Sequence, residues 1–179
     1  MGRKIEIMIK KKDKKYFLKQ KGFTITELLV VMFIISLLSA SVLISYRNNQ
    51  RSYALDQASQ QLVSNLRKAQ NMAMNKVDID GYNSYGIYAV INNNYYIIYA
   101  DNNGDSMYHS SDRIIETINL LNNVKINNTL DVFFKSPDPK TYLNGNLSAG
   151  LSRTITLGVN GTSKTKIITI TTAGLIQGN

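Results

Sequence analysis

The chain contains no cysteine and only one histidine, His109. Without cysteine there are no disulfide bonds, no thiol catalysis and no thiolate metal sites, so the fold must be held by its apolar core and its partners. The single histidine lies in a polar stretch, and no pairing of a nucleophile with a base can be recognised around it. We therefore expect His109 to be a surface residue and the chain not to be an enzyme.

Acidic residues are scarce beside basic ones, with 12 Asp and Glu against 21 Lys and Arg, and the net charge is +9. Residues 1–22 hold nine of the basic residues against two acidic ones, so they carry +7 and residues 23–179 carry only +2. Lys and Arg beside a spanning helix stay on the cytoplasmic side of the membrane. We expect residues 1–22 in the cytoplasm, the rest outside it, and no nucleic-acid binding despite Lys164 and Lys166 near the C-terminus.

Proline and glycine are absent from residues 23–76, and no charged residue occurs from Leu28 to Tyr46. The apolar run from Leu28 to Ile44 is interrupted only by Ser36, Ser39 and Ser41. A helix needs about 20 such residues to cross a hydrocarbon core of roughly 30 Å. We therefore predict a membrane-spanning helix over residues 23–46.

Beyond this segment the apolar residues recur at steps of three and four, which predicts an amphipathic continuation of the helix over residues 47–76. Its apolar positions are Leu55, Ala58, Leu62, Leu66, Ala69 and Ala73. We expect Asp78–Gly81 to end the helix, because glycine suits a left-handed turn.

From residue 82 the pattern becomes that of β-strands, predicted at 84–90, 95–100, 113–120, 124–127, 130–136, 153–159 and 164–172. Asn92–Asn94 and Asn160–Gly161 are typical of hairpin turns, whereas Pro137–Gly150 is expected to be a loop. The predicted fold class is α+β: a long N-terminal helix packed on antiparallel sheets. Its extracytoplasmic domain would span residues 47–179, with a β-rich part over 82–176.

The residues before the apolar run form an ordered motif, in which a basic leader is followed by Gly22, Phe23, Thr24 and, three residues on, Glu27. This order resembles the processing site of type IV pilins and pseudopilins. The resemblance implies that residues 1–22 are a leader, that prepilin peptidase cuts between Gly22 and Phe23, and that Phe23 becomes an N-methylated N-terminus. A start at Met8 would shorten the leader without changing this site.

Glu27 is a charge at the edge of the apolar run, and a charge within a spanning helix costs about 2.5–3.5 kcal/mol at the centre of the membrane. Cleavage would create an α-amine on Phe23, within reach of Glu27 of the same chain or of a neighbouring subunit. The resemblance therefore implies that Glu27 acts in assembly. The alternative is an interfacial carboxylate at a helix start, favoured by the helix dipole.

The later elements resemble the GspH/FimT group of minor pseudopilins and minor type IV pilins, in which two small sheets pack against the long helix. The resemblance is carried by the Tyr85–Tyr88 strand, the Asp101–Asp105 stretch and the Ile168–Gly174 ending. One departure is Ile44, because many members of the family have proline late in the apolar run. Without proline we expect a straighter anchor.

Six residues fall at the offsets of a calcium-binding loop: Asp101, Asn103, Asp105, Met107 through its backbone carbonyl, His109 and Asp112. Against this, Gly104 is at the fourth loop position, not the sixth, and Asp112 is shorter than the usual glutamate. A polar Asx-type turn is the favoured interpretation, so we expect no metal and no cofactor, with calcium as the alternative. The tyrosines at 82, 85, 88, 95, 96 and 99 are expected in strands and core.

The resemblance implies a minor pilin or pseudopilin of the cell membrane that serves secretion, motility, adhesion or DNA uptake. Its partners would be prepilin peptidase, other pilin or pseudopilin subunits and the membrane. Two alternatives stay open. One is a single-pass, membrane-anchored extracellular binding protein that does not polymerise. The other is a cleaved secretory signal peptide, although its apolar core would be shorter than this run.

Overall fold

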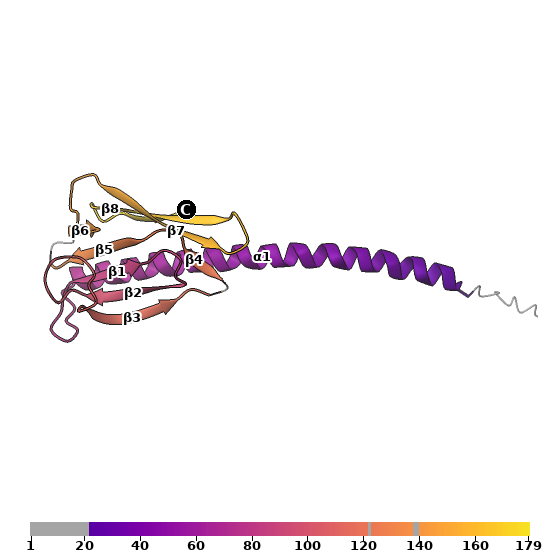
Figure 1. Cartoon of the computed structure of the whole chain (residues 1–179), viewed down its shortest axis with the longest axis horizontal. Helices are drawn as coiled ribbons and strands as arrows, with labels where there is room; N and C mark the ends of the chain where they lie inside the picture. Colours follow the sequence, from indigo (N-terminus) through magenta and orange to yellow (C-terminus); the bar gives the residue numbers. More distant parts are fainter. Residues whose placement is uncertain (1–21, 122, 138–139) are drawn as a thin grey trace, which may run out of the picture. The chain divides into compact units, whose positions relative to one another are not determined.

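A computed structural model describes residues 22–121, 123–137 and 140–179 (Figure 1). The predicted leader, apart from Gly22, and the alternative start at Met8 lie outside the described residues. The elements in chain order are α1 (Ile25–Met74), β1 (Tyr85–Ala89), β2 (Tyr95–Ala100), β3 (Arg113–Asn119), β4 (Val124–Ile126), β5 (Leu130–Lys135), β6 (Lys140–Leu143), β7 (Ser152–Val159), β8 (Thr165–Thr171) and β9 (Ile176–Gly178).

The chain divides into two compact units, Met1–Val42 and Leu43–Asn179. The described part of the first unit is residues 22–42, which include the start of α1. The apolar side chains of this part are all exposed. The second unit contains the rest of α1 and all nine strands. The helix continues through residue 44, where proline is absent. The straighter anchor expected from that absence stays a prediction.

Helix α1 ends at Met74, four residues before the predicted stop at Asp78–Gly81. The N–H of Val77 donates to the carbonyl of Met72 at 3.0 Å, and the N–H of Lys76 donates to that of Ala73 at 3.2 Å. Lys76 has a φ of 50°. This pair of bonds around a left-handed residue is the Schellman arrangement that satisfies the last carbonyls of a helix. The predicted stop was therefore wrong, because a lysine takes the left-handed position.

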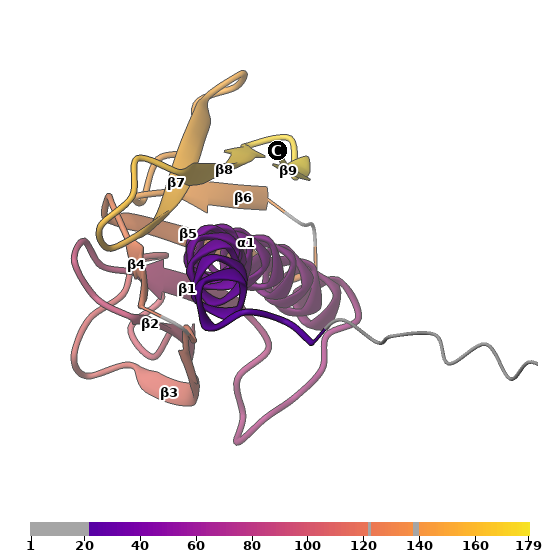
Figure 2. The same cartoon turned by 90° about the vertical axis from the view of Figure 1, so that its right-hand side faces the viewer.

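The strands of the second unit form two antiparallel sheets. One has the order β3-β2-β1-β5-β6 and the other the order β4-β7-β8-β9. The two predicted hairpins are confirmed: β1 pairs with β2 around Ile87 and Ile98, and β7 pairs with β8 around Ile155 and Ile168. In Figure 2, strands β1–β5 lie to the left of α1, and strands β6, β8 and β9 lie above it.

The core of the second unit joins one face of α1 to the inner faces of both sheets. All six apolar positions predicted on the helix are buried, and Leu62 and Leu66 are fully so. They share a cluster with Ile87 and Val132 of the first sheet and Ile168 of the second. Burying a leucine side chain of this kind contributes about 1.5–3 kcal/mol. The predicted α+β class, a long N-terminal helix packed on antiparallel sheets, is confirmed.

Two short strands depart from the prediction. Pro137–Gly150 was expected to be a loop, but its described part contains β6, which pairs with β5 through Val132 and Leu143. Leu143 is buried in the core, and the left-handed turn at Asn144 follows it directly. β9 adds an edge strand to β8. β6 lies among the Pro, Asn, Gly and Ser residues that predicted a loop, and β9 follows the left-handed turn at Gly174.

Candidate functional site

The predicted processing site lies at the start of α1, and Thr24 determines where that helix begins. The Thr24 hydroxyl accepts a hydrogen bond from the Glu27 N–H at 3.2 Å, and the Thr24 carbonyl accepts the Leu28 N–H at 3.2 Å. This is the geometry of an N-cap residue. Gly22 and Phe23 consequently lie outside the helix, and the Phe23 side chain is 85% exposed. The peptide bond between them belongs to a non-helical, accessible segment.

Glu27 occupies the first turn of α1 and is exposed. A carboxylate in this position is favoured by the positive end of the helix dipole. In the uncut chain, the nitrogen of Phe23 belongs to a peptide bond and is not an amine. The predicted pairing of Glu27 with an amine of Phe23 therefore stays a prediction.

The segment after Glu27 exposes an apolar surface all round the helix. Leu28, Phe33 and Leu38 are each more than half exposed, and α1 contains a stretch long and apolar enough to cross a membrane. Ser36 donates its hydroxyl to the Met32 carbonyl, and Ser39 donates to the Ile35 carbonyl, both at 2.8 Å. Hydroxyls bonded one turn back along the helix need no water. These serines are thus compatible with a lipid environment.

The predicted calcium loop is folded around its own backbone. Asp101 accepts hydrogen bonds from the N–H groups of Asn103, Gly104 and Ser106, at 2.7–3.0 Å. Asp112 accepts from the N–H groups of Asn102 and His109. The bonds that Asp101 accepts from the N–H groups two and three residues later are those of an Asx turn, whereas Asp112 accepts from N–H groups that precede it.

The other four predicted loop positions also interact within the loop. Asp105 accepts from the Met107 N–H at 2.9 Å and from the Asn103 side chain at 2.9 Å. His109 is half exposed, and its Nδ1 lies 3.2 Å from Asp105. Among the described residues, no group of three or more His, Cys, Asp or Glu side chains has the arrangement of a metal site. The expectation that calcium is not bound stays a prediction.

A buried polar pair that the sequence did not indicate lies on the outer face of the five-stranded sheet. The Tyr99 hydroxyl donates to Asp131 Oδ1 at 2.7 Å, and the Tyr108 N–H donates to Oδ2 at 2.6 Å. The Asp131 N–H donates to Asn144 at 2.8 Å. Asp131 therefore links strands β2 and β5 to the loop between β2 and β3 and to the turn after β6.

The environment of this pair disfavours ionisation. Burial raises the pKa of Asp131 to about 6, against the opposing effect of the hydrogen bonds from Tyr108 and Tyr99, and the nearby carboxylates of Asp112 and Asp105 raise it further. Burial and the Asp131 carboxylate likewise raise the pKa of Tyr99 far above its usual range. Because Asp131 is hydrogen-bonded both to Tyr99 in the sheet and to the Tyr108 N–H in the loop, the pair locks the loop to the sheet.

The tyrosine cluster is largely internal, as predicted. Tyr85, Tyr96 and Tyr99 are fully buried, whereas Tyr95 is 39% exposed. Tyr88 stacks on Tyr108 with ring centroids 4.6 Å apart. Most of these rings stabilise the sheet and the loop that covers it, and no wide aromatic platform results.

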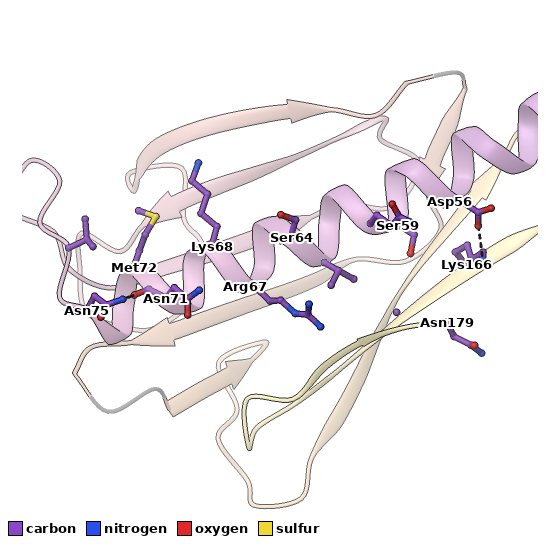
Figure 3. A pocket seen from close by; sticks show the side chains of 14 residues that line it. Asp56, Ser59, Ser64, Arg67, Lys68, Asn71, Met72, Asn75, Lys166 and Asn179 are labelled. Carbon is purple, nitrogen blue, oxygen red and sulfur yellow. Dashed lines mark hydrogen bonds and ion pairs between the residues drawn. The ribbon is translucent and has the colours of Figure 1, made fainter.

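A surface groove of about 860 Å³ runs along the polar side of α1 next to β9. In Figure 3, Asp56 is directed towards Lys166, with 3.0 Å between carboxylate and ammonium. Arg67 extends from α1 towards the C-terminal strands and donates to the Ile176 carbonyl at 3.4 Å. The residues lining the groove include no histidine, tyrosine or glutamate. Asp56 is the carboxylate side chain that lines the groove, and it is paired with Lys166.

The two lysines near the C-terminus, considered for nucleic-acid binding, are directed to α1. Lys164 donates to the Ser52 hydroxyl at 2.6 Å, and Lys166 pairs with Asp56. Both cations thus make contacts within the second unit. The expectation that nucleic acid is not a partner stays a prediction.

Comparison with known proteins bears on the start of α1. A family model described as the prokaryotic N-terminal methylation motif matches residues 18–43, which include Gly22, Phe23 and Glu27. No curated protein matches the chain, and no solved structure matches it. The match covers the predicted processing site and most of the apolar helix.

Proposed function

Because the chain carries the N-terminal methylation motif of type IV prepilin-like precursors, we propose that it is a minor type IV pilin or pseudopilin. Prepilin peptidase would cut between Gly22 and Phe23 and methylate the new amine. The mature chain would then assemble through its N-terminal helix with other subunits, in a structural and not a catalytic role. The observation that carries the proposal is the motif match over residues 18–43.

The geometry at the cleavage site supports the proposal. Gly22 and Phe23 precede the N-cap residue Thr24, so a peptidase can bind this peptide bond without unwinding α1. A Cβ added at Gly22 would meet no heavy atom of the described residues within 4 Å. A protease needs an extended, accessible backbone at the bond it cuts. A larger side chain at Gly22 would thus affect the peptidase and not the fold.

Glu27 explains physically why cleavage would favour assembly. Once Phe23 carries an amine, the carboxylate four residues later gains an opposite charge, in the same chain or in a neighbour. In a buried environment, removing one member of such a pair costs about 3–5 kcal/mol. Cleavage would therefore turn an unfavourable charge in the membrane into an assembly contact.

The exposed apolar surface of the first unit supports assembly. In a membrane, lipid would cover side chains such as Phe33 and Leu38. In a filament outside the membrane, only other subunits could cover them. Head-to-tail contacts that do not close into a ring generate such filaments. We place the chain in the GspH/FimT group, and the two sheets, of five and four strands, support this subgroup.

Processing tests the proposal. Co-expression with prepilin peptidase should convert the wild-type chain and the control Ile25→Val to a product that begins at Phe23. Gly22→Leu should leave the chain at full length in the membrane. An uncut chain that retains its cellular function would contradict the proposal and favour an anchored binding protein that does not polymerise.

A further inference from the structure

Two arginines follow the apolar segment without an acidic partner. Arg47 and Arg51 lie one turn apart on α1, both exposed. No acidic residue occurs between Glu27 and Asp56 in the sequence. Asp56 is bound to Lys166 at 3.0 Å. Among the described residues, no carboxylate lies within ion-pair distance of either arginine. Both guanidinium groups are therefore available to an external anion.

A hollow of about 420 Å³ lies beside these arginines. Its lining combines the two guanidinium groups with the side chains of Gln50, Tyr53 and Asn123. No carboxylate lines it. Guanidinium groups bind phosphate with two parallel hydrogen bonds, and amides and hydroxyls can add further donors. The hollow thus offers donors and positive charge to a group the size of a phosphate.

A third cation lies near this segment. Lys164, in the connection between β7 and β8, donates to the Ser52 hydroxyl at 2.6 Å. Its charge is therefore next to the helical turn that carries Arg51. Three cations around one turn of helix attract anions and repel other cations.

The place of the arginines in the sequence indicates the source of the anion. Twenty residues separate Glu27 from Arg47, and a helix of that length rises about 30 Å, the thickness of the hydrocarbon core. Arg47 would therefore reach the headgroup layer on the far side, with Arg51 one turn beyond. Tyr46 and Tyr53 are exposed on either side of them, and tyrosine is enriched at this depth.

We propose that Arg47 and Arg51 bind the phosphate of an anionic phospholipid headgroup in the outer leaflet, with phosphatidylglycerol as the simplest such lipid. The proposal rests on the proposed function insofar as it requires the apolar segment to span the membrane. Positive charge is usually kept on the cytoplasmic side. Bound anionic lipid neutralises the two arginines and holds the helical turn that carries them at the membrane surface before assembly.

Spin-labelled lipids test this directly. The full-length chain is reconstituted into phosphatidylcholine vesicles with a trace of spin-labelled phosphatidylglycerol or phosphatidylcholine, and electron paramagnetic resonance measures the fraction held at the protein. We expect the two arginines to raise the preference for phosphatidylglycerol by roughly 25-fold, since each basic residue near a surface contributes about fivefold. Residues 1–22 carry +7 in both wild type and variant and also attract phosphatidylglycerol, so the arginines are measured by difference. The variant Arg47→Gln/Arg51→Gln should show a preference roughly 25-fold below that of the wild type.

The matched control, Arg153→Gln/Lys135→Gln, removes the same charge from exposed positions on β7 and β5 and should keep the preference. An equal loss in this control, or no loss in the arginine variant, would overturn the proposal. Abolition of the preference by millimolar inorganic phosphate would assign the site to a free anion. An unchanged lipid preference, together with lost assembly in the arginine variant, would assign it to an acidic protein partner.

This experiment is separable from the proposed function. Lipid preference is measured on the uncut chain, so failure of processing leaves it measurable. Conversely, the arginine variant should still be cut between Gly22 and Phe23 and should still resist extraction from the membrane by alkaline carbonate.

Discussion

The ionisation of Asp131 makes a quantitative prediction about folding. Its carboxyl group is buried against Tyr99 and Tyr108, and burial raises its pKa from the ordinary 3.8 to about 6. The folded chain thus holds this proton more tightly than the unfolded chain. The stability that the protonated group contributes is complete below about pH 3.8 and is lost as the pH rises through about 6.

The size of the effect follows from the shift. A pKa shift of one unit corresponds to 1.36 kcal/mol, so the whole shift changes the free energy of unfolding by about 3 kcal/mol. About 2 kcal/mol of this change occurs between roughly pH 4 and pH 7. Asp131→Asn removes this titration and leaves the other groups in place. The stability advantage of the wild type over Asp131→Asn should therefore shrink by about 2 kcal/mol as the pH rises across that range.

The assay is guanidinium denaturation of the full chain in detergent micelles, followed by circular dichroism of the second unit at several pH values. Tyr99→Phe is a companion variant that keeps the ring but removes the hydroxyl bound to Asp131 at 2.7 Å. That hydrogen bond lowers the pKa of Asp131, so its loss should raise this pKa further. The free energy of unfolding of Tyr99→Phe should therefore fall more steeply with pH than that of the wild type. A wild-type advantage that stays constant or grows with pH would refute the reasoning, because the hydrogen bonds to the carboxylate would then outweigh its burial.

Three further predictions concern packing, assembly and metal. A Cβ at Gly86 would lie 2.4 Å from Tyr99 Cε1, so Gly86→Ala should lower the free energy of unfolding by about 1–3 kcal/mol. In a chain that already carries Tyr99→Leu, the same substitution should cost less; an unchanged denaturation midpoint for Gly86→Ala alone would contradict the close contact. Glu27→Gln should leave cleavage intact but reduce incorporation into filaments, measured by shearing and immunoblotting; normal incorporation would remove Glu27 from the assembly contact. Thermal melts with calcium and with chelator should coincide, since backbone N–H groups already bind the Asp101 and Asp112 carboxylates; a higher melting temperature with calcium would show a metal site.

The elements predicted from sequence were those with long periodic patterns or distinct turns. The helix face of Leu62 and Leu66 and the hairpin around Asn160–Gly161 each repeat a signal several times. Shortness alone does not explain why β6 and β9 were missed, because β4, with three residues, was predicted. Turn residues surround β6, and β9 follows the left-handed turn at Gly174. The helix end was misplaced because Lys76, an ordinary residue, takes the left-handed position.

The candidate site could be predicted only where its residues are close in sequence. Gly22, Phe23 and Glu27 lie within six residues, so their order was visible without a structure. Tyr99 and Asp131 are 32 residues apart on strands β2 and β5, and neither residue type is unusual where it stands. Only the pairing of strands β2, β1 and β5 brings them together. Contacts that depend on strand order cannot be predicted from local spacing.

The central claim is that the chain is a precursor whose mature form begins at Phe23. Mass spectrometry of the N-terminal peptide, isolated from cells that contain prepilin peptidase, tests it most directly. The account predicts a peptide that begins at Phe23 with one added methyl group on its amine. A peptide from the leader still joined to Phe23, or an N-terminus created by cleavage beyond the apolar run, would contradict it.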